Sequence, residues 1–141
     1  MTYHVWRPPE AFLLILVVWL AVATNEVIDV LGHVTQGGRP RRSFWTHSIL
    51  TAPLWGMATA FPPVCILAIV FGQALTTPLA LSSVSLGIAI AYSHLLLDVL
   101  TEGGVYLFRR RVAIAHLRYD NPVLNGAFIA LGVLLVFAAV T

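Results

Sequence analysis

Long apolar stretches without a charged residue dominate the sequence. Residues 43–97 contain no Asp, Glu, Lys or Arg, and shorter charge-free stretches cover residues 11–25 and 121–141. A helix needs about 20 mostly apolar residues to cross the hydrocarbon core of a membrane. The longest stretch therefore holds two spans, separated near Thr76-Thr77-Pro78. The pattern predicts four transmembrane helices, at about residues 11–32, 46–75, 79–101 and 122–140.

Proline positions refine these spans. Pro8-Pro9 and Pro122 suit the first turns of the first and last spans, where a missing backbone N–H costs little. Pro62 and Pro63 lie inside the second span. Because proline removes a helical hydrogen bond and crowds the preceding turn, we expect a kink or break there. The predicted fold is an all-α integral membrane bundle that forms a single domain over residues 1–141.

Composition supports a membrane protein. Apolar residues make up 59% of the chain and charged residues 10%, whereas soluble domains carry about 25% charged residues. This balance excludes a soluble globule, a disordered chain and a coiled coil. The single cysteine, Cys65, excludes an internal disulfide. Residues 1–23 resemble a cleavable leader that ends in Ala21-Val22-Ala23, but Pro8, Pro9, Glu10 and a single Arg make cleavage the less favoured reading.

Arginine placement predicts the topology. With four spans, the loops at residues 34–45 and 103–121 share one side of the membrane. That side holds all the arginines except Arg7, namely Arg39, Arg41, Arg42, Arg109, Arg110, Arg111 and Arg118. The positive-inside rule makes this side cytoplasmic. We expect a multi-pass cell-membrane protein with both termini outside, surrounded by lipids and able to form a homo-oligomer, with no nucleic-acid partner.

Titratable residues gather at the predicted cytoplasmic ends of the spans. Asp29 and His33 are four residues apart, as are His94 and Asp98, so each pair shares a helix face. His47 opens the second span. Imidazole and carboxylate ligands without thiolates suit zinc, with manganese or iron as alternatives. Five candidate ligands exceed the three that a catalytic zinc needs, so we slightly favour two ions over one.

Other polar residues near this end have more than one interpretation. Glu26 and Glu102 lie one turn from the main set, and either is a candidate general base. His116 is a weaker candidate ligand in the cytoplasmic loop. Arg39, Arg41 and Arg42 are most simply topology signals and lipid contacts, although they could also hold a phosphate near the metal. Each Asp or His could instead be a structural group that hydrogen-bonds between helices.

The motif residues resemble those of a known family. They form the runs Asn25-Glu26-Val27-Ile28-Asp29-Val30-Leu31-Gly32-His33, Thr46-His47-Ser48 and Ser93-His94-Leu95-Leu96-Leu97-Asp98. This set resembles the YdjM-like membrane proteins, described as metal-dependent hydrolases, and most closely an archaeal branch of unknown function. The resemblance implies that Asp29, His33, His47, His94 and Asp98 bind the metal.

The sequence therefore favours one function over two alternatives. The favoured function is a membrane-embedded hydrolase with one or two metal ions at the cytoplasmic interface, acting on a lipid or phosphoester. The first alternative is a non-catalytic protein whose metal or polar cluster staples the helices or docks a partner. The second is an ion or proton carrier, which ranks last because polar residues do not continue through the whole membrane thickness.

Overall fold

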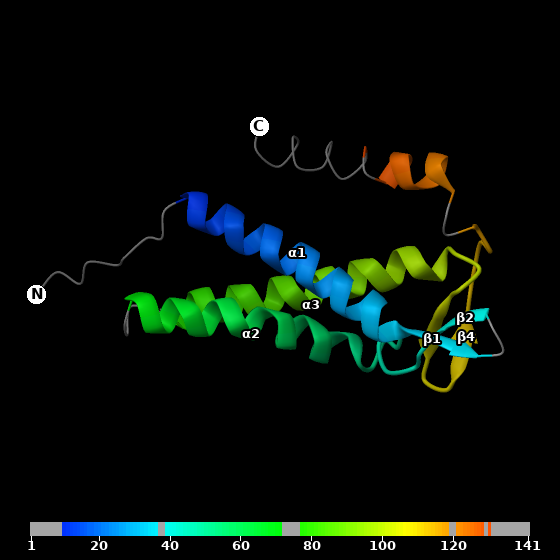
Figure 1. The fold of residues 1–141 in the computed structure, drawn as a ribbon, viewed down its shortest axis with the longest axis horizontal. Coiled ribbons are helices and arrows are strands. Elements are labelled where there is room, and N and C mark those ends of the chain that lie inside the picture. The colour runs from blue at the N-terminus through cyan, green and yellow to red at the C-terminus, as the bar shows by residue number, and fades with distance from the viewer. Residues whose placement is uncertain (1–9, 37–38, 72–76, 119–120, 129, 131–141) are drawn as a thin grey trace, which may run out of the picture.

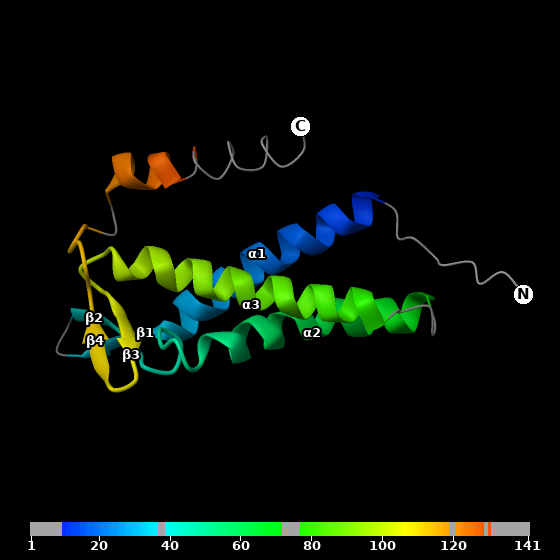
Figure 2. The ribbon, with the colours of Figure 1, turned by 180° about the vertical axis from the view of Figure 1, so that it is seen from behind.

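Three long helices form the body of the protein. The computed structural model describes residues 10–36, 39–71, 77–118, 121–128 and 130. Helices α1 (Glu10–Gly32), α2 (Ala52–Phe71) and α3 (Thr77–Val99) lie side by side, with α2 antiparallel to the other two (Figures 1 and 2). The C-terminal ends of α1 and α3 and the N-terminal end of α2 therefore meet at one end of the bundle. The chain is mostly helical, as predicted.

Each of the three helices is long and apolar enough to cross a membrane. The candidate spans are Phe12–Gly32, Ala52–Val70 and Leu79–Val99. Large apolar side chains cover the outer faces of these helices, and Ile69 is 81% exposed. A water-soluble helix would carry polar residues on that face. These features are consistent with an integral membrane protein.

The predicted fourth span is only partly covered by the structure. Residues 122–128 are helical, beginning at Pro122 as expected. The rest of the predicted span, apart from residue 130, lies outside the described residues. Three candidate spans are therefore established among the described residues, and the fourth stays a prediction.

Small residues allow α2 and α3 to approach closely. A side chain on Gly56 or Gly87 would collide with the backbone of the other residue. Such backbone contact between helices is typical of membrane bundles, where small residues let dispersion and polar contacts form. The buried hydroxyls of Thr24 and Thr59 lie 2.7 Å apart and link α1 to α2.

The expected break at Pro62-Pro63 is not present, because α2 continues through both prolines. Pro63 cannot donate a hydrogen bond to the carbonyl of Thr59, four residues earlier. The indole Nε1 of Trp19 on α1 donates to that carbonyl instead, at 3.1 Å. A neighbouring helix thus satisfies the acceptor that proline leaves without its helical partner, which is how membrane helices tolerate internal proline.

The all-α prediction is wrong in detail, because two short antiparallel hairpins cap the site end of the bundle. Strand β1 (His33–Gln36) pairs with β2 (Arg39–Arg42), and β3 (Val105–Leu107) pairs with β4 (Arg110–Val112). Figure 1 shows both hairpins beside the C-terminal end of α1. The sequence predicted loops in these segments because they are polar. They form hairpins instead, since pairing between strands satisfies their backbone N–H and C=O groups.

The second helix begins later than predicted, at Ala52 rather than Thr46. The backbone of residues 47–49 pairs with Tyr106, whose N–H donates to the carbonyl of His47 at 2.7 Å and whose carbonyl accepts from Ile49 at 3.1 Å. These bonds hold the segment extended beside β3, so His47 lies in the approach to α2 and not on the helix.

Candidate metal centre

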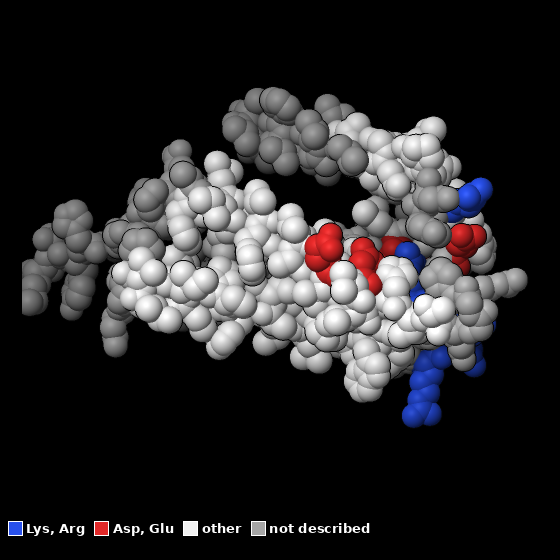
Figure 3. All heavy atoms as spheres, viewed as in Figure 1, with Lys and Arg blue, Asp and Glu red and all other residues white. Residues whose placement is uncertain are grey.

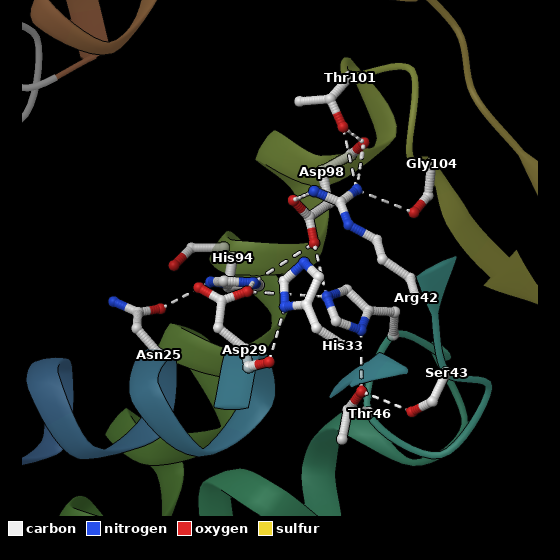
Figure 4. A network of polar contacts seen from close by, with 12 residues as sticks. Asn25, Asp29, His33, Arg42, Ser43, Thr46, His94, Asp98, Thr101 and Gly104 are labelled. Atoms are coloured by element: carbon white, nitrogen blue, oxygen red, sulfur yellow. Dashed lines mark hydrogen bonds and ion pairs between the residues drawn. The ribbon is translucent and has the colours of Figure 1, made fainter. Parts of the chain in front are cut away.

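Four side chains from three segments converge at the hairpin end of the bundle (Figure 4). Asp29 comes from the last turn of α1, His47 from the segment before α2, and His94 and Asp98 from successive turns of α3. The Nε2 atom of His94 lies 3.4 Å from Oδ1 of Asp29 and 3.3 Å from Oδ2 of Asp98. The Nε2 atom of His47 lies 3.8 Å and 3.4 Å from the same two oxygens.

The facing atoms have no hydrogen-bond partner among the described residues. Nε2 of His47, Nε2 of His94 and Oδ2 of Asp98 are buried and contact one another only at ion-pair distances. Buried polar atoms are normally hydrogen-bonded, because leaving one unpaired costs about 1–3 kcal/mol. Three such atoms around one point make this a candidate metal site.

The distances between imidazole nitrogens and carboxylate oxygens are close to those between neighbouring donors of a metal ion. Around an ion with donor distances of about 2.0–2.1 Å, neighbouring donors lie about 3.3–3.4 Å apart. The four separations between imidazole nitrogens and carboxylate oxygens are 3.3–3.8 Å. Asp29, His47 and His94 alone also offer three ligand atoms within 4.8 Å of one another. The donor set suits zinc and other borderline divalent ions.

Hydrogen bonds on the far side of each imidazole set its tautomer. Nδ1 of His94 lies 2.9 Å from Oδ1 of Asn25, an acceptor, so this nitrogen carries the proton. Nδ1 of His47 lies 2.8 Å from Oγ1 of Thr46, which lies 3.0 Å from Oγ of Ser43. In the tautomer in which Nδ1 is the donor in both rings, both Nε2 atoms present lone pairs to the centre. Metal-binding histidines are usually oriented in this way.

Arg42 fixes the orientation of Asp98. Its Nη2 atom lies 2.6 Å from Oδ1 of Asp98, and both side chains are about 90% buried. Its Nη1 atom donates to Oγ1 of Thr101 at 2.9 Å and to the carbonyl of Gly104 at 3.1 Å. With Oδ1 held by the guanidinium, Oδ2 is left to face the centre. These contacts engage both terminal nitrogens within the protein, and the suggestion that Arg42 holds a phosphate stays a prediction.

Burial controls the charge of His47. Its side chain is fully buried, and this desolvation lowers the pKa of the imidazole below its usual value of 6.5, against the opposing effect of Asp29. A neutral imidazole is the form that binds a metal. The surroundings therefore keep His47 ready to act as a ligand at neutral pH.

The centre opens on one side to a cavity of about 470 Å³. Asp29 is the exposed member of the set, with 47% of its side chain accessible. The remaining wall combines polar and apolar side chains from α3, β1, β2 and residues 122–128. The lining residues are Asp29, His33, Arg42, Leu97, Asp98, Thr101, Asn125 and Phe128. The cavity thus borders the centre at Asp29 and Asp98.

His33 is the one predicted ligand that stands apart from the converging atoms. It is exposed at the start of β1, and its Nδ1 lies 2.7 Å from the backbone carbonyl of Asp29. Its ring packs edge-on against that of His47, with centroids 5.7 Å apart. His33 therefore flanks the centre, because the change from helix to strand after Gly32 turns it away from the face that carries Asp29.

The structure does not bring the two predicted general bases into the centre. The side chains of Glu26 and Glu102 are both exposed, and neither carboxylate has a hydrogen bond or ion pair with a described residue. Glu102 instead uses its backbone, which pairs with Leu117 and Arg111. His116 is also exposed, in the segment after β4.

Sequence reasoning missed the residues that support the ligands. Asn25 lies four residues before Asp29, so helical spacing places it on the same face. Thr46 directly precedes His47, and its role could not be inferred from spacing because the segment is not helical. Gly32 is buried against His47, and any side chain there would collide with the imidazole and with Thr46.

Comparisons with known proteins correct the predicted family. A family model described as "Protein of unknown function (DUF1286)" matches residues 8–97, which include all the converging ligands except Asp98. Nothing ties the chain to the YdjM-like proteins, so that expected membership is wrong. The shared features were short polar motifs in membrane helices, which two families can hold independently. No curated protein and no solved structure matches the chain.

Proposed function

The chain belongs to the DUF1286 family, and from the geometry of its site we propose that it is a membrane-embedded, metal-dependent hydrolase. One divalent ion, zinc in the first place, binds to Asp29, His47 and His94 with one position left for water, and Asp98 lies beside it. The observation that carries the proposal is the set of three buried, unpaired ligand atoms around one point.

The cavity beside the centre favours a catalytic role. A metal of this kind lowers the pKa of a bound water to about 7 and polarises the bond that is cleaved. Asp29, the exposed donor, lies where the cavity meets the centre. Asn25 and Thr46 orient the two imidazoles, and Arg42 orients Asp98.

We also propose the placement of this site in the membrane. Four transmembrane helices, including one that begins at Pro122, put both termini outside and the two hairpins in the cytoplasm. The arginine distribution supports this orientation. The described acidic and basic side chains gather at the hairpin end of the molecule, as Figure 3 shows from one side. The ion then lies near the cytoplasmic surface.

A specific observation favours a second candidate function. Four protein donors complete the coordination of a tetrahedral zinc, as in structural sites. They also come from α1, α3 and the segment before α2, so an ion would tie these parts of the chain together. In this alternative the metal stabilises the bundle and no reaction follows.

Metal content, stability and hydrolysis together test both functions. The full chain is purified in detergent, and its zinc, manganese and iron are measured by mass spectrometry. Asp29→Asn and His94→Gln keep the approximate shape but remove a donor, and we expect each to lose most of the bound metal. His116→Asn is the matched control, because His116 is exposed and asparagine tolerates its positive φ of 49°.

The outcomes separate the two functions. Metal-dependent cleavage of bis(p-nitrophenyl) phosphate or a carboxylic ester, lost in both variants, supports the hydrolase. Stoichiometric metal that raises the Tm without any cleavage supports the structural role. If the purified protein binds no transition metal although it remains folded and monodisperse, both functions are wrong.

A further inference from the structure

The depth of the donors within the apolar spans is the first indication of the substrate. Asp29 lies three residues before the end of Phe12–Gly32, and His94 and Asp98 lie five residues and one residue before Val99. At 1.5 Å per residue, they stand about 2–8 Å inside the span ends. The headgroup layer begins at the span ends and is about 5–8 Å thick. The glycerol and phosphate linkages of a lipid therefore lie directly beside the depth of the donors, on its outer side.

The walls of the 470 Å³ cavity are amphipathic. The lining includes the carboxylates of Asp29 and Asp98 together with the apolar side chains of Leu97 and Phe128. Leu97 is 40% exposed on α3, a candidate membrane span, so its outer side faces the acyl chains. A molecule with a polar linkage and apolar chains can contact both kinds of side chain at once, whereas a small polar solute would leave Leu97 and Phe128 without a partner.

The charge of the centre selects among polar groups. With neutral imidazoles, Asp29, Asp98 and Arg42 sum to one negative charge, and a divalent ion changes this sum to one positive charge. A group with a single negative charge neutralises the loaded site, and a phosphodiester has that charge. Exposed Arg109 and Arg110, on the second hairpin at the same end, attract anionic lipid to this surface.

Resting on the metal-dependent hydrolase proposed above, we propose that the substrate is a membrane phospholipid, which enters the cavity beside Leu97 with its phosphodiester at the metal centre. A new bond forms between the oxygen of water and phosphorus. The bond from phosphorus to one of its two alcohols breaks, that alcohol takes up a proton from the water, and a phosphomonoester remains. No oxidant or second substrate is needed.

The test uses the full chain in lipid vesicles. Zinc-loaded protein is reconstituted into phosphatidylcholine vesicles that contain an ether-linked phosphatidylglycerol, which has no carboxylic ester. Phosphomonoester formation is followed by phosphorus NMR. Parallel reactions contain bis(p-nitrophenyl) phosphate, a soluble phosphodiester, or a diacyl phosphatidylglycerol from which fatty acid could be released.

A matched pair of variants tests the cavity. Leu97→Ser shortens the apolar wall, and we expect it to raise the KM for the lipid about fivefold and the KM for the soluble diester by clearly less. Leu96→Ser is the control, since Leu96 is 67% exposed on the preceding position of α3 but lines a different cavity. It makes the same chemical change in the same helix, and its lipid KM should equal that of the wild type.

Each result has a defined meaning. Zinc-dependent cleavage of the ether lipid, weakened by Leu97→Ser and not by Leu96→Ser, supports the inference. Cleavage of the soluble diester without cleavage of either lipid overturns it and leaves the hydrolase in place. Release of fatty acid from the diacyl lipid without phosphomonoester shows that the substrate class is wrong. If no substrate is cleaved by zinc-loaded protein, the hydrolase itself is refuted.

Discussion

Gly32 provides the sharpest test of the metal centre, because it touches a ligand without being one. It is the buried last residue of α1, and a Cβ atom there would collide with Cε1 of His47 and Oγ1 of Thr46. The same Cβ would lie 2.7 Å from Nδ1 of His47. Comfortable contacts between such atoms are about 3.5–4.0 Å. In a Gly32→Ala variant the imidazole must therefore retreat by about 1 Å.

A shift of that size exceeds what a metal tolerates. Donor distances in metal sites vary by only about 0.2 Å, so His47 would leave the coordination sphere or the whole set would rearrange. We expect Gly32→Ala to lower zinc affinity at least as much as the loss of an orienting hydrogen bond, about 10–100-fold. Overpacking a buried site also costs about 1–3 kcal/mol of folding free energy.

Two measurements separate these effects. Zinc affinity is measured by competition with a chromophoric chelator, and the Tm is measured in the presence of excess chelator, so that stability is compared without metal. Gly126→Ala is the matched control, because Gly126 lies in the helix at residues 122–128 and a Cβ there meets nothing within 4 Å. Wild-type zinc affinity in Gly32→Ala would refute the position of His47 and, with it, the proposed coordination.

Three further predictions concern the surroundings of the centre. Thr46→Val removes the hydroxyl beside Nδ1 of His47 and should lower zinc affinity about tenfold in the same competition assay, whereas Thr24→Val, at the buried hydroxyl pair with Thr59, should lower only the Tm. Gly87→Ala forces a Cβ against the carbonyl of Gly56 and should cost about 1–3 kcal/mol, seen as a lower Tm in detergent with Gly126→Ala unchanged. Burial lowers the pKa of His47, so its neutral form stabilises the metal-free fold above pH 6.5, and that contribution is lost as the pH falls further. The Tm difference between wild type and His47→Gln should therefore shrink in acid. A constant difference would show that His47 does not titrate in this way.

The parts of the site that lie on helices could be predicted from the sequence. His94 and Asp98 are separated by one helical turn, and α3 carries both to the centre as expected. Asp29 follows from the same reasoning on α1, because apolar length places it at the end of the first span. In a helix, residues three or four positions apart lie on the same face, so residue numbers alone show which side chains share a face.

The hairpins and the position of His47 could not be predicted in this way. The turn between β3 and β4 contains Phe108 at a φ of 55°, where a sequence signal would be Asn or Gly. Strand β2 contains Pro40 and three arginines, with none of the alternation that marks a strand. Both hairpins form because the chain must satisfy its backbone where the helices end, and residues 47–49 pair with Tyr106 for the same reason.

The hydrogen bonds around the imidazoles decide between a metal site and an ordinary polar staple. A staple pairs donors with acceptors, as the hydroxyls of Thr24 and Thr59 do. In the centre, Asn25 and Thr46 engage the Nδ1 atoms, so neutral rings turn two nitrogen lone pairs toward two carboxylate oxygens. Four acceptors in one buried place repel one another unless a cation lies among them. A protonated His94 together with Arg42 would balance the charges of Asp29 and Asp98 but would leave Nε2 of His47 without a hydrogen-bond partner, whereas a divalent ion engages both imidazoles and both carboxylates.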